Sequence, residues 1–547
     1  MYLRGDCGSD MALVTKMTRG ERKWMWGYSI LIILLTTLPY LLAFSSEGDA
    51  WSFTGFVFGV EDGNSYIAKM LRGYVGDWLF FTPYTTAEQG GVVAFLPYFL
   101  LGRLAGGIEI HRQQIILFQV MRVVSIPFVV YATYRFISLF IDRIWWRRWA
   151  TILGTLGGGF GWIVLISGQG AVLGSLPLDF ISPETFGFLS IFGLPHLIIA
   201  RGLLLLGLVF YLESREDHRK AWIGGGCLLL LTFVQPLSVL VAYAAIGAHM
   251  LAVAIFGLIQ KEKPKIVTWF RAAARVSLPS LPVVIYLALQ FSSDPFLKAW
   301  TAQNRILSPH IAHYALAYGL VLIPAIFGAR AIIHSKKTTS LFPLSWVVIS
   351  LVLAYFPYNL QRRLPEGSWV AWVALAALGM MSIFKEERKR RIGGVILLAF
   401  SVISSIVLIL GGANVARRPS SPIFRPAEEV TAFEWLALHA ENGDHVLSSF
   451  STGNVLPAWA PVHVVIGHGP ESVDFARLAP QVEAFFADPA STQARQKFLH
   501  EHDVRFVFYG PNEKMMGGWN PDQSSILAEV YSGGEYQIFE VEVERSQ

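Results

Sequence analysis

The stretch that decides the fold reads VEDGNSYIAKMLRGYVGDW over Val60–Trp78, within the polar region between the first two apolar runs. Its apolar residues recur at helical spacing, which predicts a short helix with one apolar stripe lying on the bilayer or on other helices: Ile67, Met70, Leu71, Tyr74 and Val75. Asp62 is predicted at the N-cap, where backbone N–H groups and the helix dipole hold a carboxylate. Asp62 is therefore either only a helix cap or a catalytic carboxylate at a water–lipid boundary.

The composition is that of a polytopic membrane protein. Of 547 residues, 53% are hydrophobic and 15% charged, and the mean hydropathy is +0.47, whereas a soluble domain carries about a quarter charged residues. The net charge of +5 is small and the basic residues cluster in short loops. They therefore report membrane orientation and not binding to nucleic acid. Two cysteines, Cys7 and Cys227, imply no disulfide framework.

Apolar runs of about 20 residues predict about eleven membrane spans. They are placed at residues 24–44, 114–138, 148–166, 196–213, 221–236, 237–258, 271–291, 312–334, 342–358, 367–384 and 392–412. The first span is interpreted as an uncleaved anchor with a cytoplasmic N-terminus, because it lacks a clear small-x-small cleavage site and follows a basic cluster: Lys16, Arg19, Arg22 and Lys23.

The apolar run Val92–Leu104 decides the topology. Counted as a span, it would place the basic residues at 143–148 outside and invert every later basic loop. Left out, all the basic clusters fall on the cytoplasmic side: Arg143/Arg147/Arg148, Arg215/Arg219/Lys220, Lys261/Lys263/Lys265, Lys336/Lys337 and Lys385/Arg388/Lys389/Arg390/Arg391. Residues 92–104 are therefore predicted to be a second surface or re-entrant helix in a long first outer loop, 45–113. The protein is expected to be integral to the plasma (inner) membrane.

With Val92–Leu104 not counted as a span, residues 413–547 fall outside. They are predicted to form an extracytoplasmic α/β domain that follows the transmembrane domain, 1–412. The linker before it is Arg417–Pro422. Helices are expected at 427–440, 473–487 and 490–502, and strands at His445–Ser448, Val462–Ile466, Val504–Tyr509 and Tyr536–Val543.

An ordered series of motifs runs through the first outer loop: Asp62-x-x-x-Tyr66, Gly76-Asp77-Trp78, the helix near 92–104, and Arg122 early in the next span. This series resembles the GT-C superfamily of membrane glycosyltransferases, including protein O-mannosyltransferases and the lipid A aminoarabinose transferase. The C-terminal domain is similar to that of some large bacterial members at Glu434-Trp435-Leu436, Gly467-His468-Gly469 and Arg505-Phe506-Val507. Two departures stand out. Gly63 replaces a Glu after the catalytic Asp, and Glu88-Gln89-Gly90-Gly91 occupies the place of a Lys-Pro-Pro element.

The resemblance implies transfer of a sugar, with inversion, from a polyprenyl-phosphate donor to a lipid, glycan or protein acceptor at the outer membrane face. A carboxylate must take the acceptor's proton from within about 3 Å; Asp62 is the candidate and Glu61 its alternative. Cations must stabilise the phosphate as the bond breaks. The candidate substrate-binding residues are Tyr66, Glu88, Arg122, Glu184, His196, Arg201, Arg305, Arg362 and Arg363.

Each candidate has a structural alternative. Arg201 could pair with an outer-loop acid, Arg362 and Arg363 could extend into lipid head groups, and His196 could simply begin a helix. Glu184 follows Ser182-Pro183, an ordinary helix start. His468 is expected to be a turn residue first and an acceptor contact second. In part of the superfamily the second outer loop, here the one with Asp179 and Glu184, supplies a metal-binding acidic motif. No Asp-x-Asp pair exists in it here, so dependence on a divalent cation stays open but unsupported, and no metal ligand is assigned.

Two other classes of protein remain open. A transporter or lipid flippase would place ionisable groups and broken helices near the midplane of paired repeats, whereas this chain gathers acids in one outer loop. A non-catalytic membrane subunit that presents the C-terminal domain would not need the combination of Asp62, Arg201 and Arg362.

Overall fold

The structure, a computed structural model, describes residues 17–261, 266–335, 337–487 and 490–542. The predictions made for Cys7, Lys16, Lys263, Lys265, Lys336 and Val543 lie outside these residues. Contacts divide the chain into two compact units. The first comprises Met1–Thr37, Met121–Leu287 and Ile306–Gly411, and the second Leu38–Val120, Ala288–Arg305 and Gly412–Gln547. The second unit therefore groups the first loop with the C-terminal region.

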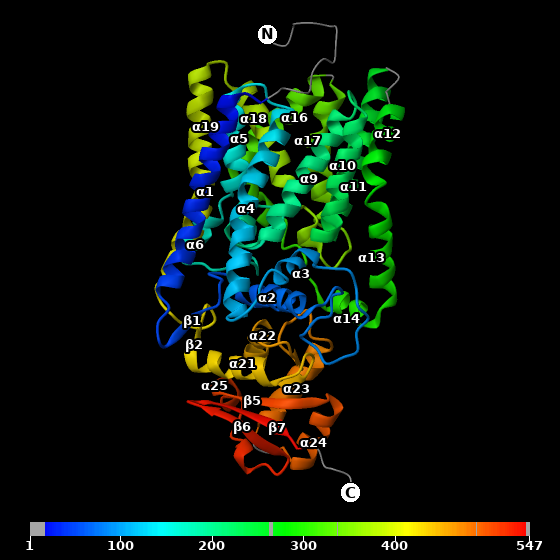
Figure 1. The fold of residues 1–547 in the computed structure, drawn as a ribbon. Coiled ribbons are helices and arrows are strands. Elements are labelled where there is room, and N and C mark those ends of the chain that lie inside the picture. Colours follow the sequence, from blue (N-terminus) through cyan, green and yellow to red (C-terminus); the bar gives the residue numbers. More distant parts are fainter. Residues whose placement is uncertain (1–16, 262–265, 336, 488–489, 543–547) are drawn as a thin grey trace. The chain divides into compact units, whose positions relative to one another are not determined.

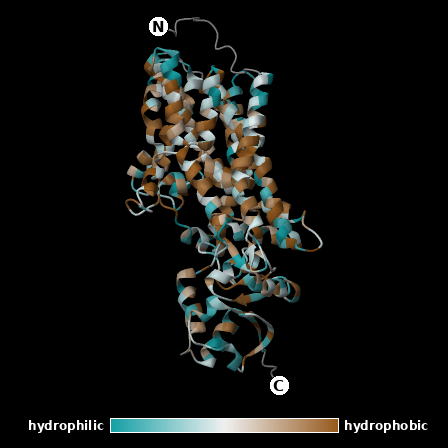
Figure 2. Cartoon of the chain, turned by 90° about the vertical axis from the view of Figure 1, so that its left-hand side faces the viewer, coloured by the Kyte–Doolittle hydropathy of each residue, from teal (hydrophilic) through white to brown (hydrophobic). Residues whose placement is uncertain are grey.

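The first unit is built of helices (Figure 1) in which hydrophobic residues predominate (Figure 2). It contains α5 (Ile144–Leu156), α6 (Gly161–Ile166), α7 (Leu178–Ile181), α8 (Gly187–Gly193), α9 (Pro195–Glu213), α10 (Arg219–Val234), α11 (Pro236–Gln260), α12 (Ile266–Ser277), α15 (Ala312–Tyr318), α16 (Leu322–His334), α17 (Leu341–Leu353), η3 (Gln361–Arg363), α18 (Ser368–Ile383), α19 (Glu387–Ser401) and most of α20 (Ile403–Ala416), with parts of α1 (Arg19–Ser45), α4 (Ile110–Ser138) and α13 (Leu281–Ser293).

Small residues allow these helices to approach closely. A Cβ added at Gly328 of α16 would lie 1.9 Å from the carbonyl oxygen of Leu375 in α18, and one at Gly379 would lie 1.7 Å from that of Pro324. In a lipid-embedded bundle, such contacts supply the packing that the hydrophobic effect cannot.

Among the described residues, six helices are long and apolar enough to cross a bilayer, or seven if the bent pair α12–α13 is one span. Two further apolar helices are shorter, Thr338–Leu353 and Ser368–Ile383. These helices are those of an integral membrane protein. The number of spans, predicted as about eleven, stays a prediction.

The span predicted at 148–166 is wrong as a continuous helix, because α5 ends at Leu156. Gly157 is extended with ψ 147°, and Ser404 donates a hydrogen bond of 2.7 Å to the buried Asp179 beside the break. A Cβ at Gly161 would lie 2.0 Å from Asp179 Oδ1. The glycines thus make room for this carboxylate, which an apolar-run count does not detect.

The helix predicted at 92–104 is α3 (Leu96–Gly102), of seven residues. At 1.5 Å per residue it rises about 10 Å, far less than a hydrocarbon core of about 30 Å. Its length supports the topology in which this segment does not cross.

The sidedness itself is a testable prediction. In a chain with Cys7 and Cys227 replaced by Ser, a cysteine at exposed Gln481 should react with a membrane-impermeant maleimide on intact cells. One at exposed Asp142 should react only after permeabilisation, because its loop is expected to be cytoplasmic. Labelling of Asp142→Cys from outside, or protection of Gln481→Cys, would overturn the topology.

The second unit contains a mixed five-stranded sheet of order β4-β3-β5-β7-β6. Its strands are β3 (His445–Leu447), β4 (His463–Val464), β5 (Val504–Tyr509), β6 (Leu527–Gly533) and β7 (Tyr536–Val541). β4, β3 and β5 are parallel, and β7 pairs antiparallel with both β5 and β6. The helices of this region are α21 (Ala427–His439), α22 (Phe450–Val455), α23 (Phe475–Phe486), α24 (Thr492–Glu501) and α25 (Pro511–Lys514). The predicted C-terminal α/β architecture is confirmed.

The first loop is joined to this sheet region. β1 (Trp51–Phe53) pairs antiparallel with β2 (Phe424–Pro426), and the N–H of Val464 in β4 donates to the carbonyl of Pro83 at 2.8 Å. The loop also contains α2 (Val60–Val75), and α14 (Pro295–Gln303) belongs to the same unit.

The apolar stripe of α2 is buried at Ile67, Met70 and Leu71. It packs against α3 at very short range: a Cβ at Gly102 would lie 1.8 Å from the carbonyl oxygen of Met70. On the neighbouring side, Ala68 joins the apolar core of the sheet region. Of the two predicted surroundings for the stripe, packing on another helix is observed for this part of it, whereas Tyr74, also predicted in the stripe, is 39% exposed. Helix α2 is therefore packed on two sides, which fixes the backbone of the residues in its first turn.

Candidate active site

The two candidate catalytic carboxylates lie in the first turn of α2. The helix begins at Val60, and its N-cap is Gly59, with φ 59° and no side-chain cap bond. The prediction of Asp62 as the N-cap is therefore wrong, because the left-handed cap conformation favours a glycine. Glu61 and Asp62 still benefit from the helix dipole, and the Asp62 side chain is 62% exposed.

His468 lies directly against Asp62. Its Nε2 is 3.4 Å from Asp62 Oδ1, and only 7% of its side chain is exposed. The Ser472 hydroxyl accepts hydrogen bonds from the N–H groups of Gly467 and His468, at 3.1 and 3.2 Å. The next N–H, of Gly469, points to Glu61 Oε1 at 3.4 Å. One tight loop thus reaches both carboxylates.

A buried ion pair supports this loop. Lys69 Nζ lies 2.7 Å from Glu471 Oε1, and the exposed fractions of the two side chains are 1% and 5%. Glu471 also accepts hydrogen bonds from Ser65 at 3.0 Å and Thr82 at 2.5 Å, and Lys69 donates to the Ser65 hydroxyl. A buried ion pair is tolerated only when hydrogen bonds of this kind offset the cost of removing both charges from water.

The electrostatics follow from these contacts. Burial by itself would raise the pKa of Glu471, but the positive charges of Lys69 and His468 outweigh it and lower that pKa. Burial by itself would lower the pKa of His468, but the carboxylates of Asp62 and Glu471 raise it above its ordinary value. The four side chains thus alternate in charge, from the buried cation Lys69 through Glu471 and His468 to the exposed anion Asp62.

Two asparagines join α2 to α22. The Asn64 amide donates to Asn454 Oδ1 at 2.8 Å, and the Asn454 amide donates to the Glu61 carbonyl oxygen at 3.3 Å. The Tyr84 hydroxyl donates to the Asn454 carbonyl oxygen at 3.0 Å. These contacts fix the backbone of the turn that bears the carboxylates.

The glycine at position 63 has a steric reason. A Cβ at this position would lie 2.5 Å from the ring of Phe56, so a Glu would require that ring to move. Glu61 and Asp62 are therefore the two acids that this turn can present.

The other motifs of the loop have structural roles. Tyr66 stacks on Tyr98 with ring centroids 4.9 Å apart. Gly76, with φ 113°, ends α2, Asp77 pairs with Arg72 at 2.6 Å, and Trp78 lies under the Arg103 guanidinium at 4.0 Å. Glu88 is exposed, and Arg305, also in this unit, is exposed in the segment after α14.

Within the first unit, Arg201 and Arg363 lie in one cluster with Glu184 and Glu366. Arg201 is 3% exposed; its Nη2 donates to the carbonyl oxygens of Pro183 and Glu184, at 2.8 and 2.6 Å, and lies 3.8 Å from Glu366 Oε1. The Arg363 Nε pairs with Glu184 Oε1 at 3.1 Å, with 32% of its side chain exposed.

The arginines at positions 201, 362 and 363 differ in accessibility. Arg201 braces a loop, whereas Arg362 and Arg363 are half-buried in η3. Within the described residues, the Nε atoms of Arg362 and Arg363 are buried without a hydrogen-bond partner, although that of Arg363 lies in the ion pair with Glu184.

The remaining predicted cations are internal. Arg122 is fully buried in α4 and donates to the hydroxyls of Thr36 and Thr37, at 3.1 and 3.0 Å. His196 is 9% exposed in the first turn of α9, after Pro195.

Sequence reasoning missed Lys69 and Glu471. The available signal was Lys69 itself, a charge between Ala68 and Met70 on an apolar stripe. Such a lysine requires a buried partner. Asp62, Ser65 and Lys69 also share one helix face by their spacing of three and four residues.

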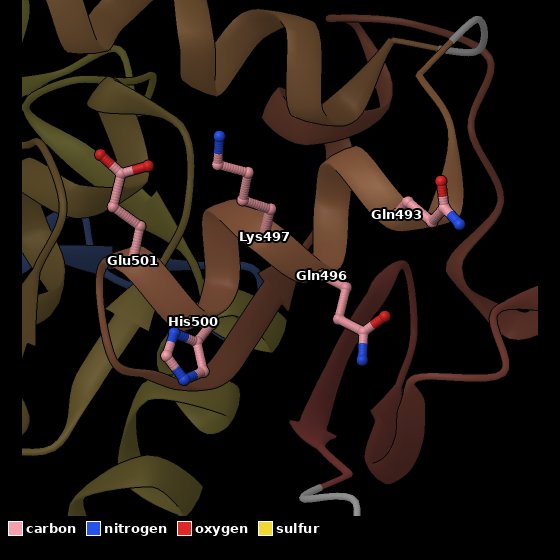
Figure 3. Close-up of a pocket in the computed structure, with 5 residues that line it drawn as sticks. All are labelled: Gln493, Gln496, Lys497, His500 and Glu501. Carbon is pink, nitrogen blue, oxygen red and sulfur yellow. The ribbon is translucent and has the colours of Figure 1, made fainter.

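Two other features of the molecule concern ligand binding. Among the described residues, no group of three or more His, Cys, Asp and Glu is arranged to hold a metal ion. The surface hollow in Figure 3 is lined by five residues of α24 alone: Gln493, Gln496, Lys497, His500 and Glu501. It brings no second element to a site.

No family model matches the chain, and no curated protein matches it. Among solved structures, AglB, the oligosaccharyltransferase of Archaeoglobus fulgidus in complex with an inhibitory peptide and a dolichol-phosphate, aligns with 90% of this chain and 70% of its own at a TM-score of 0.54 and 11% identity. The apo form of the A. fulgidus oligosaccharyltransferase aligns over 97% of this chain and 76% of its own chain. Its TM-score is 0.51 and its sequence identity is 12%. ArnT from Cupriavidus metallidurans, bound to undecaprenyl phosphate, aligns over 94% of this chain and 98% of its own chain. Its TM-score is 0.46 and its sequence identity is 11%.

At these identities the likeness to the oligosaccharyltransferase concerns the fold. The GT-C fold expected from the first loop is therefore confirmed.

Proposed function

We propose that this GT-C-fold chain is a membrane glycosyltransferase that moves a sugar from a polyprenyl-phosphate carrier to an acceptor hydroxyl at the outer face of the plasma (inner) membrane. Asp62 accepts the hydroxyl proton, and Glu61 is the alternative base. The sugar is transferred with inversion, and the acceptor is a lipid, a glycan or a protein.

The observation that carries this proposal is the exposed Asp62 beside the buried His468. The carboxylate is open to a substrate, while its surroundings are rigid: α2 is packed on α3, and His468 is held next to Glu471 and Lys69. A base needs this combination, because positioning within hydrogen-bond reach of the reacting proton contributes much of its effect.

The chemistry then balances simply. The acceptor oxygen forms a bond to the anomeric carbon, the bond from that carbon to the phosphate oxygen breaks, and the proton passes to Asp62. The carrier leaves as polyprenyl phosphate. The dolichol-phosphate bound to AglB supports a carrier of this class.

We assign the leaving phosphate to Arg362 and Arg363. Both side chains are half-buried, the Nε of each has no hydrogen-bond partner within the described residues, and guanidinium groups suit phosphate geometry. Arg201 contributes indirectly. It donates to the backbone carbonyl oxygens of Pro183 and Glu184, and the Glu184 side chain is the ion-pair partner of Arg363.

The phosphate assignment makes a prediction about binding. Arg362→Ala and Arg363→Ala should each weaken undecaprenyl phosphate binding roughly 10- to 100-fold, because one charge-assisted contact contributes about 1.5–3 kcal/mol. Native mass spectrometry of the full chain in nanodiscs measures this. Arg388→Ala, an exposed arginine at the start of α19, is the control. Unchanged affinity in both variants would contradict the assignment.

The function is tested by release of the carrier. The full chain in nanodiscs is given a panel of synthetic polyprenyl-phosphate hexoses and pentoses, with the envelope fraction of the source organism as acceptor. Free polyprenyl phosphate and labelled acceptor should appear together with one donor and be absent with Asp62→Asn. Carrier binding without release from any donor would favour a transporter or a non-catalytic subunit.

A further inference from the structure

We propose that His468 is a positioning residue whose protonated ring tethers Oδ1 of Asp62 and so sets the orientation of the carboxylate that receives the acceptor's proton. The transfer rate should therefore fall at alkaline pH, when this ring loses its proton. The inference rests on the proposed role of Asp62 and adds a residue from the C-terminal region.

The geometry pairs a fixed group with a mobile one. His468 is held by its loop and is almost fully buried, whereas 62% of the Asp62 side chain is exposed. An exposed side chain can occupy several rotamers, and a contact between its end and a buried group restricts them. The separation of 3.4 Å from Nε2 to Oδ1 is long for a hydrogen bond, and such contacts tighten when substrate binds.

The ring has a carboxylate on each side. Nε2 faces Asp62, and Nδ1 lies 4.0 Å from Glu471 Oε1. Nδ1 is buried and has no hydrogen-bond partner among the described residues. A neutral imidazole carries one N–H and one lone pair, so it would turn a lone pair toward one of the two carboxylates. Only the doubly protonated ring serves both.

The other charged and titratable groups around His468 come from two segments. Helix α2 contributes Lys69, which is already paired with Glu471, and Glu61, which lies near the N–H of Gly469. The loop after α2 contributes the Tyr84 ring, 5.4 Å away. With one ammonium against several carboxylates, the balance favours the cationic ring, in agreement with its raised pKa.

The sign of the pH effect follows. Because the folded-state pKa of His468 is raised, its stabilising contact with Asp62 is fully present below the ordinary histidine pKa of about 6.5 and is lost as pH rises through the folded-state value. A tether therefore predicts a descending alkaline limb in the rate. A histidine that instead took the proton from Asp62 would have to be neutral at the start and would give a rising limb.

Two variants separate these roles. His468→Gln keeps an N–H donor but does not titrate, so it should retain part of the activity and lose the alkaline decline. His468→Phe keeps a ring without a donor and should lower the rate roughly 10- to 100-fold at the pH values where the wild-type ring is protonated, and its rate should show no alkaline decline. Both are measured by carrier release in nanodiscs with the donor panel described above.

A second measurement requires no substrate. In the full chain labelled with ring-¹³C histidine, the His468 signal is identified by its absence from the His468→Gln variant. Its titration midpoint should lie above 6.5 and should fall in Asp62→Asn, which removes one of the facing charges.

The outcomes are distinct. An alkaline decline that persists in His468→Gln, a rising limb that His468→Gln abolishes, or a midpoint unmoved in Asp62→Asn would each overturn the tether. In any of these cases an inactive Asp62→Asn would leave the proposed function standing. An active Asp62→Asn would overturn the function itself.

Discussion

Asp62→Asn should lower the rate of sugar transfer by roughly 100-fold or more, while the chain stays folded and still binds undecaprenyl phosphate. The amide has the shape of the carboxylate but cannot accept the proton. Because Gly59 and not Asp62 caps α2, the substitution removes no helix cap, and a loss of activity cannot be assigned to a lost cap. Carrier release measures the rate, and the thermal unfolding midpoint reports folding.

Two other acids of the same loop complete this test. Asp49→Asn is the control, because Asp49 is exposed and lies outside the cluster around α2; its rate should be unchanged. Glu61→Gln should retain activity. If Glu61→Gln were inactive while Asp62→Asn remained active, the base would be Glu61. If both remained active, the catalytic site would lie elsewhere.

Lys69→Met should destabilise the second unit by about 3–5 kcal/mol, because it leaves Glu471 buried without its cation. The methionine keeps the apolar stem, so little packing is lost. The cost should shrink as pH falls, since Glu471 has a lowered folded-state pKa and its ionised form contributes stability that disappears once it is protonated. Unfolding of the full chain in nanodiscs, followed at pH 7 and pH 4, measures both effects.

The matched control is Lys497→Met on exposed α24, which should change stability by less than about 1 kcal/mol. The double variant Lys69→Met/Glu471→Gln should recover part of the loss, since the unpaired charge is gone. A loss in Lys69→Met no larger than in the control would show that the buried pair does not hold α2 to the C-terminal region.

Local patterns were sufficient for the elements that have a strong period of their own. The strand predicted at Val504–Tyr509 has those bounds in the structure, and the helix predicted at 427–440 is α21, Ala427–His439. Strand β6, Leu527–Gly533, was missed. It lies at the edge of the sheet with a mostly half-exposed pattern, so its pairing with β7 and not its own sequence makes it a strand.

The sequence by itself determined the membrane class, the GT-C-like first loop, the amphipathic α2 and its carboxylates, because hydrophobic periodicity and short motifs are local. Only the tertiary structure decided which groups meet those carboxylates. Lys69 pairs with Glu471 and Asp62 faces His468, across about 400 intervening residues in each case. The physical reason is that a buried charge requires a partner, and the sequence shows the requirement without showing which distant segment folds back to meet it.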